Sequence, residues 1–213
     1  MDVSTPGRSG HPQPVGIVSP FLKWVGAKTR SMNVLLSCLP SPQAVDCLIE
    51  PFAGSTSVFI NTRYRQYVLA DSNADLVDTW RHARDNPEGL TEALHHLFGD
   101  GNTEMAWQRN RLAFNTMPPG PEKSALFIYL NRHGFNGLCR YNQKGLFNVP
   151  FGRYRKRGPY GTLTFQPTLF PMSFPYPTAT SKGEKECLRA GPGSPSGLYS
   201  LSRCRVQMLW FRF

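Results

Sequence analysis

Two acidic residues stand directly after two short apolar runs. Residues 44–49 form the first run and precede Glu50, and residues 67–70 form the second and precede Asp71. In open α/β sheets, ligands bind at the carboxyl ends of the strands. An acid at the tip of the second strand, about 20 residues beyond the first turn, is suited to accept hydrogen bonds from a ribose. These residues therefore predict a nucleoside-binding α/β domain.

The elements that must position these acids follow from the apolar pattern. Residues 1–20 are expected to form a disordered arm, and apolar residues at i, i+3, i+4 and i+7 predict a helix over residues 29–39. Further helices are predicted near 57–63, after 71 up to 86, and over about 87–133 with a break at 118–121. The predicted core of that last stretch is Leu90, Leu94, Leu97, Trp107, Phe114, Leu126, Ile128 and Leu130.

A polar segment over residues 131–154 follows, dense in amide, guanidinium, aromatic and glycine residues. Residues 143–145 predict a hairpin turn, and residues 146–149 predict a returning strand. Taken alone, this segment is best interpreted as an ordinary glycine-rich hairpin with solvated polar side chains.

Three segments occur in one order along the chain. Residues 21–28 read FLKWVGAK, residues 50–59 read EPFAGSTSVF with ADSN at 70–73, and the third is residues 131–154. Together they resemble the cofactor motifs and the target-recognition hairpin of the Dam-type DNA adenine methyltransferases. That family uses S-adenosylmethionine to modify the adenine of GATC in double-stranded DNA. Three segments in the right order are a far more specific signal than any one of them.

The resemblance implies a cofactor site. Its expected residues are Trp24, Lys28, Glu50, Gly54 and Asp71. Trp24 could instead be a core tryptophan, Lys28 a lysine at a helix start, and Asp71 the N-cap of the helix expected from Ser72. Glu50 could balance a cationic cofactor or cap a helix. Residues 26–29 are not a phosphate-binding loop, because the earlier glycine of that motif is absent.

The resemblance also implies a DNA-contacting set. Arg140 is the candidate for reading guanine, because a guanidinium can pair with guanine O6 and N7 in the major groove. Phe135 and Leu138 are candidates to wedge beside a flipped base. The other members, for bases or phosphates, are Arg132, Asn136, Asn142, Asn148 and Arg153.

Two departures from the family pattern stand out. Thr56 occupies the place of the second glycine of the family's GxG, where a Cβ would crowd the cofactor or demand a backbone shift. The catalytic DPPY motif, which holds and activates the adenine amino group, does not occur in the 213 residues. No catalytic residue is therefore assigned, and we expect a methyltransferase sequence that is truncated or frame-shifted after about residue 155 and inactive alone.

Net charge and cysteine content limit the kinds of partner, compartment and metal site that we expect. The net charge is +10, with +3 in residues 1–154 and +7 in residues 155–213, so the excess lies in a tail that we expect to be irregular. A basic balance favours polyanionic partners. Five cysteines without a C-x-x-C pair predict a reduced, cytoplasmic protein without a metal site, and no apolar run is long enough to span a membrane.

We predict an α/β fold of the S-adenosylmethionine-dependent methyltransferase kind. A mainly parallel, incomplete sheet over residues 21–86 would carry the cofactor, and helices with a β-hairpin over 87–154 would recognise DNA. The second hypothesis is a non-catalytic DNA-binding protein that prefers certain sequences. A third, a nicotinamide-dependent oxidoreductase, requires G-x-G-x-x-G after the first strand, and residues 54–56 do not supply it.

Overall fold

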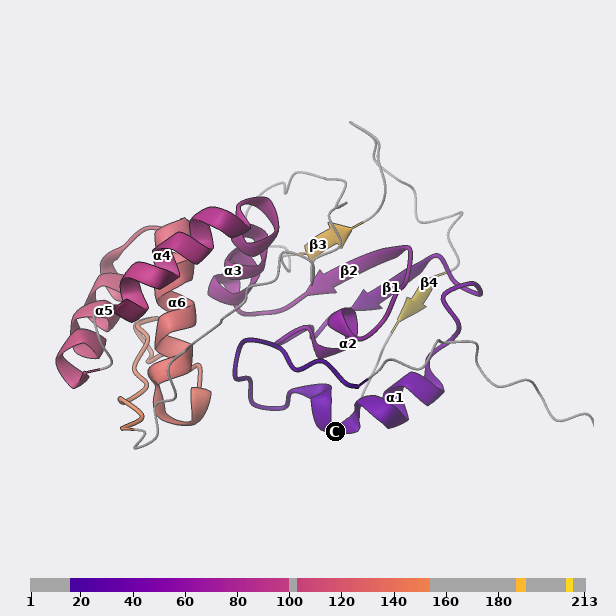
Figure 1. Ribbon diagram of the computed structural model, residues 1–213, viewed down its shortest axis with the longest axis horizontal. Coiled ribbons are helices and arrows are strands. Elements are labelled where there is room, and N and C mark those ends of the chain that lie inside the picture. The colour runs from indigo at the N-terminus through magenta and orange to yellow at the C-terminus, as the bar shows by residue number, and fades with distance from the viewer. Residues whose placement is uncertain (1–15, 100–102, 154–186, 191–205, 209–213) are drawn as a thin grey trace, which may run out of the picture.

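The computed structural model describes residues 16–99, 103–153, 187–190 and 206–208 (Figure 1). A small sheet with two helices forms one end of the described chain, and a group of four helices forms the other. Each end has its own cluster of buried apolar side chains. The arrangement is a mixed helix and strand fold, as the sequence predicts.

The sheet is built on two parallel strands. Strand β1 (Cys47–Glu50) pairs with β2 (Gln66–Ala70), and the short helix α2 (Ser57–Ile60) lies between them in the sequence. Strand β4 (Val206–Met208) pairs in parallel with β1, and β3 (Cys187–Ala190) pairs antiparallel with β2, which gives the order β3-β2-β1-β4. Because β1 and β2 run parallel, their carboxyl ends, Glu50 and Ala70, meet at one edge of the sheet.

Helix α1 (Met32–Cys38) covers the sheet with its apolar face. A 3-10 turn, η1 (Lys28–Ser31), leads into it, so the predicted helix over 29–39 exists with a tighter first turn. Met32, Leu35 and Leu39 are buried against Leu48 of β1, together with α2 and β2. The i, i+3, i+7 spacing of these three residues explains why one face is buried while Val34 remains exposed.

Helix α6 (Pro121–His133) is the centre of the helical group. It contacts α3 (Ala74–Asp85), α4 (Pro87–Gly99) and α5 (Glu104–Thr116). A helix surrounded in this way is buried on all sides, and residues 124–131 of α6 are all buried. Of the prolines predicted to break the helical stretch, Pro118 and Pro119 lie between α5 and α6, and Pro121 is the first residue of α6. Seven of the eight predicted core residues are buried, and Leu97 is partly buried.

The polar segment after α6 folds back onto the helices. It begins with the 3-10 turn η2 (Phe135–Gly137), and the predicted turn at 143–145 is present. The strand predicted over 146–149 is wrong, because only Phe147 forms a β-bridge, with Tyr141. Phe147 and Val149 are buried in the helical core, so packing against the helices holds this hairpin together with its isolated backbone bridges.

The two ends of the chain are described only in part. Residues 16–20 belong to the predicted disordered arm, yet Val18 exchanges two hydrogen bonds of 2.8 Å with the side chain of Asn61. Strands β3 and β4 come from the tail predicted to be irregular. The rest of the arm and of the tail lies outside the described residues, and there both predictions stay predictions.

Candidate functional site

A pocket of about 410 Å³ opens at the carboxyl ends of β1 and β2. All five residues of the predicted cofactor set line it: Trp24, Lys28, Glu50, Gly54 and Asp71. They come from three separate stretches of sequence, namely the segment before η1, the turn after β1 and the tip of β2. The pocket also takes in Val25, Phe52 and Ser57, which the sequence did not single out.

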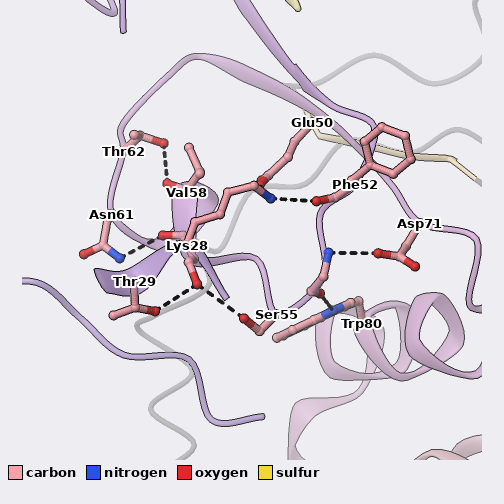
Figure 2. A network of polar contacts seen from close by, with 12 residues as sticks. Lys28, Thr29, Glu50, Phe52, Ser55, Val58, Asn61, Thr62, Asp71 and Trp80 are labelled. Atoms are coloured by element: carbon pink, nitrogen blue, oxygen red, sulfur yellow. Dashed lines mark hydrogen bonds and ion pairs between the residues drawn. The ribbon is translucent and has the colours of Figure 1, made fainter. Parts of the chain in front are cut away.

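Glu50 and Lys28 form a buried ion pair in the pocket wall. Lys28 Nζ lies 2.9 Å from Glu50 Oε1 and donates a second bond of 2.7 Å to the carbonyl oxygen of Phe52, as Figure 2 shows. Glu50 is 1% exposed, and burial raises its pKa to about 7 although the Lys28 charge acts to lower it. The second carboxylate oxygen, Oε2, is buried and accepts no hydrogen bond from the described residues. The wall therefore holds an acceptor that a positively charged or N–H-bearing ligand could satisfy.

Gly54 and Asp71 join the two strand ends. The Gly54 N–H donates a 2.9 Å hydrogen bond to Asp71 Oδ2 (Figure 2). Trp80, a residue of α3, donates a hydrogen bond from its Nε1 to the Gly54 carbonyl oxygen. Gly54 has a φ of +50°, and an added Cβ would stand 2.9 Å from Trp24 Cδ1. Both the left-handed backbone and the close approach of the indole require glycine at this position.

Asp71 is held by the turn after β2 and does not cap the following helix. Its Oδ1 accepts a 3.0 Å bond from the Asn73 N–H. The N-cap of α3 is Asn73, whose side chain accepts from the Leu76 N–H, and α3 begins at Ala74. The alternative interpretation, in which Asp71 caps a helix starting at Ser72, is therefore wrong. A carboxylate oxygen has more than one lone pair, so both oxygens of Asp71 can accept further bonds from a pocket ligand.

Thr56 has an unusual backbone conformation, and its side chain does not line the pocket. It is buried, adopts a left-handed conformation with φ +59°, and is not among the residues that line the cavity. Its hydroxyl has no hydrogen-bond partner within the described ranges. A β-branched residue in this conformation is strained by about 1–2 kcal/mol. Thr56 thus adopts a left-handed conformation that a glycine at this position would adopt without strain.

In the recognition segment, Arg140 is exposed but held in place. Its Nε donates to Asn148 Oδ1 at 2.9 Å and its Nη2 donates to the Asn148 carbonyl at 3.1 Å. The backbones of the same two residues are also bonded, because the Asn148 N–H donates a hydrogen bond to the Arg140 carbonyl oxygen. Two predicted residues are therefore brought together, with Asn148 orienting the guanidinium of Arg140.

The tip of η2 presents two further predicted residues to solvent. Phe135 is 48% exposed, and Asn136 is exposed with a φ of +53°. Leu138 is half-buried and packs against the helical core. Phe135 and Asn136 are thus available to a partner, whereas Leu138 also supports the loop.

The other three members of the predicted DNA set make contacts within the chain. Asn142 Oδ1 accepts from the N–H groups of Lys144 and Leu146 and so shapes the turn. Arg132 donates to the Phe21 carbonyl at 3.0 Å, and Arg153 pairs with Glu104 at 3.1 Å while remaining largely exposed. Arg132 is the least accessible of the predicted phosphate contacts.

The structure also brings together polar residues that the sequence did not assign. Tyr141 donates a 2.6 Å bond to Asp75 Oδ2 near the start of α3, and Asn73 donates to Cys139 Sγ at 3.3 Å. These bonds connect the hairpin with the segment that follows Asp71. No cluster of three or more potential metal ligands occurs in the described part of the chain, and none of its helices is long and apolar enough to cross a membrane.

Comparison with known proteins gives consistent matches. Residues 24–163 match the family model of the D12 class N6 adenine-specific DNA methyltransferases, which is well over half of the chain. The chain is 44% identical over 138 residues to a DNA adenine methylase of Haemophilus influenzae and 45% identical over 137 residues to one of Serratia marcescens. It is 42% identical over 137 residues to the DNA adenine methylase of Escherichia coli K12.

Each of these matches covers 64% of this chain and 48–50% of the relative, so the chain spans about half the length of the curated relatives it matches. The matched region includes the pocket, the four helices and the recognition segment. The chain belongs to the D12 class of N6 adenine-specific DNA methyltransferases.

Proposed function

We propose that the pocket at the ends of β1 and β2 binds S-adenosylmethionine and that the segment 131–154 binds duplex DNA containing GATC. The single observation that carries the first part is the convergence of five predicted residues from three stretches of sequence on one cavity. The finer fold assignment, a methyltransferase sheet with a recognition region over 87–154, is part of the same proposal. It is supported by the parallel β1–β2 pair and by the family match.

The residues of the pocket suit the cofactor in three respects. Asp71 at the tip of β2 would accept hydrogen bonds from the ribose hydroxyls. The unsatisfied Oε2 of Glu50 would accept from a positively charged group, and Trp24 would stack against the adenine. Lys28, 14% exposed at its side chain, would stand near the cofactor carboxylate while remaining paired with Glu50. When bound, S-adenosylmethionine supplies an activated methyl group on its sulfonium.

Methyl transfer needs groups that these 213 residues do not contain. Adenine N6 is a poor nucleophile until acceptors localise its lone pair, and the family's DPPY motif provides them. Because that motif is absent from the sequence, we propose that this polypeptide by itself binds cofactor and DNA without transferring the methyl group. Methyl incorporation into GATC duplex by the purified chain would contradict this part.

Equilibrium dialysis with labelled S-adenosylmethionine tests the pocket. Asp71→Ala should weaken binding at least about tenfold, since hydrogen bonds to a charged group contribute roughly 1.5–3 kcal/mol. Asp85→Ala is the matched control, because Asp85 pairs with Arg84 at the end of α3 and does not line the pocket. Equal affinities of the two variants would refute the assignment.

The second hypothesis is a DNA-binding protein without catalysis, and the DNA binding that both hypotheses share is supported by the geometry at Arg140. A guanidinium that is exposed and already oriented by Asn148 suits reading of a guanine edge. Arg140→Ala should cost about 1–3 kcal/mol on a GATC duplex and little on a permuted one. Lys144→Ala removes one exposed charge from the same hairpin and should weaken both duplexes alike. If Arg140→Ala also weakened both alike, Arg140 would contact phosphate.

A further inference from the structure

One buried side chain connects the pocket with the recognition segment. Asn131, 1% exposed in the last turn of α6, accepts a 2.9 Å bond from the Lys23 N–H at Oδ1. Its Nδ2 donates to the Lys23 carbonyl at 2.7 Å and to the Gly137 carbonyl at 3.1 Å. The side-chain amide of Asn131 therefore makes two hydrogen bonds to the backbone of Lys23, 108 residues away, and a third to the loop after α6.

The two partners of Asn131 lie next to candidate functional residues. Lys23 directly precedes Trp24, which lines the pocket, and Gly137 ends the loop that exposes Phe135 and Asn136. The two partners also touch each other, because a Cβ added at Gly137 would collide with the side chain of Lys23. With a φ of +65°, Gly137 permits this approach as few other residues could.

We propose that Asn131 is a positioning residue that fixes the pocket segment 23–28 and the recognition loop 135–137 relative to each other. Its effect on binding rests on the proposed function: a ligand in the pocket and a duplex on the loop would share this one support. Loss of the Asn131 bonds should then weaken binding at both places, although the side chain touches neither ligand site directly.

Asn115 provides a matched control. Its Nδ2 donates to the Phe147 carbonyl at 3.1 Å, and its Oδ1 accepts from the Phe147 N–H at 2.8 Å. The chemistry is the same two-bond pair between an asparagine amide and a distant backbone. It holds the hairpin to α5 and does not reach the pocket segment.

Hydrogen exchange of the ligand-free full chain tests the positioning role without assuming any ligand. In Asn131→Asp, the carboxylate still accepts from Lys23 but cannot donate to the carbonyls of Lys23 and Gly137. In Asn131→Asp we expect the amide hydrogens of both segments, 23–28 and 135–137, to exchange at least about tenfold faster than in the wild type. In Asn115→Asp we expect faster exchange only around Phe147. Unchanged exchange in Asn131→Asp, or faster exchange of both segments in Asn115→Asp, would overturn the proposal.

Asn131→Ala covers the case in which Asn131→Asp does not fold, because it removes the same three bonds without placing a charge in the interior. Faster exchange in both segments would support the proposal, and faster exchange confined to 135–137 would overturn it. Binding affinities then test the effect on the ligands separately from the positioning role. Asn131→Asp should weaken the binding of S-adenosylmethionine and of GATC duplex about tenfold each, whereas Asn115→Asp should weaken the binding of the duplex alone. A wild-type chain without affinity for either ligand would refute the proposed function and leave the exchange result standing.

Discussion

The buried Glu50 carboxyl should make the protein less stable as the pH rises. Burial raises its pKa from 4.5 to about 7 in the folded chain, against the lowering effect of Lys28. The folded state then binds the proton more tightly than the unfolded state. A group with a raised folded pKa contributes stability below its unfolded pKa and loses it as the pH rises through the folded value.

The magnitude follows from the two pKa values. A single site with pKa about 7 folded and 4.5 unfolded loses about 2 kcal/mol of unfolding free energy between roughly pH 5.5 and 8.5. Glu50 is 1% exposed, so solvent screening does little to reduce this figure. For a chain of this size, that is a large part of the total stability.

Urea unfolding at several pH values measures this contribution. The stability of the wild type at each pH reflects every titrating group, so the contribution of Glu50 is isolated by comparison with Glu50→Gln. The glutamine side chain cannot ionise and has nearly the same shape as glutamate. The difference between the two profiles should change by about 2 kcal/mol over that range, with the wild type losing stability faster. Glu92→Gln, at an exposed position on α4, should run parallel to the wild type. Parallel profiles for Glu50→Gln and the wild type would refute the reasoning.

Three further substitutions test individual contacts. Thr56→Gly should stabilise the protein by about 1 kcal/mol in urea unfolding, because glycine adopts φ +59° without strain, whereas Thr56→Ala should not. Gly54→Ala should weaken S-adenosylmethionine binding in dialysis, because the new Cβ would displace the Trp24 indole; unchanged affinity would show that the indole is not a contact. Tyr141→Phe should cost about 1–3 kcal/mol in thermal unfolding by removing the 2.6 Å bond to Asp75, and a smaller loss would mean that water replaces it.

The periodicity of the sequence predicted most elements because the spacing of apolar residues within one helix or strand is a local feature of the sequence. Helix α1 shows the expected apolar face, the four helices from α3 to α6 fall within the predicted stretches, and β1 and β2 lie within one to three residues of the predicted runs. Their parallel pairing followed from the short helical crossover between them. It placed Glu50 and Asp71 at one edge, and this is why the pocket could be located from sequence.

The strand over 146–149 was mispredicted because the hairpin pairs only through isolated bridges, while Phe147 and Val149 pack into the helical core. Phe147 and Val149 stand two residues apart, as on one face of a strand, but the Phe147 ring packs edge-on to Phe114 of α5 at 5.7 Å. Asp71 was open to a capping interpretation because Asp, Ser and Asn are all good N-caps, and only the geometry shows that Asn73 takes that place.

The long-range amide bonds could not be predicted from sequence. Asn131, Asn115 and Asn61 each bind the backbone of a residue between 32 and 108 positions away. An asparagine in a helix carries no sequence pattern that identifies a distant backbone partner. Such bonds follow from the tertiary structure, and those of Asn131 and Asn115 hold backbone that is adjacent in sequence to predicted site residues.

Photo-crosslinking with radiolabelled S-adenosylmethionine, followed by peptide mapping of the full chain, tests the central claim most directly. The proposal predicts label in peptides that contain Trp24 or the stretch from Glu50 to Asp71, and competition by unlabelled cofactor. Label confined to other peptides, or label that unlabelled cofactor does not displace, would contradict the assignment of this pocket.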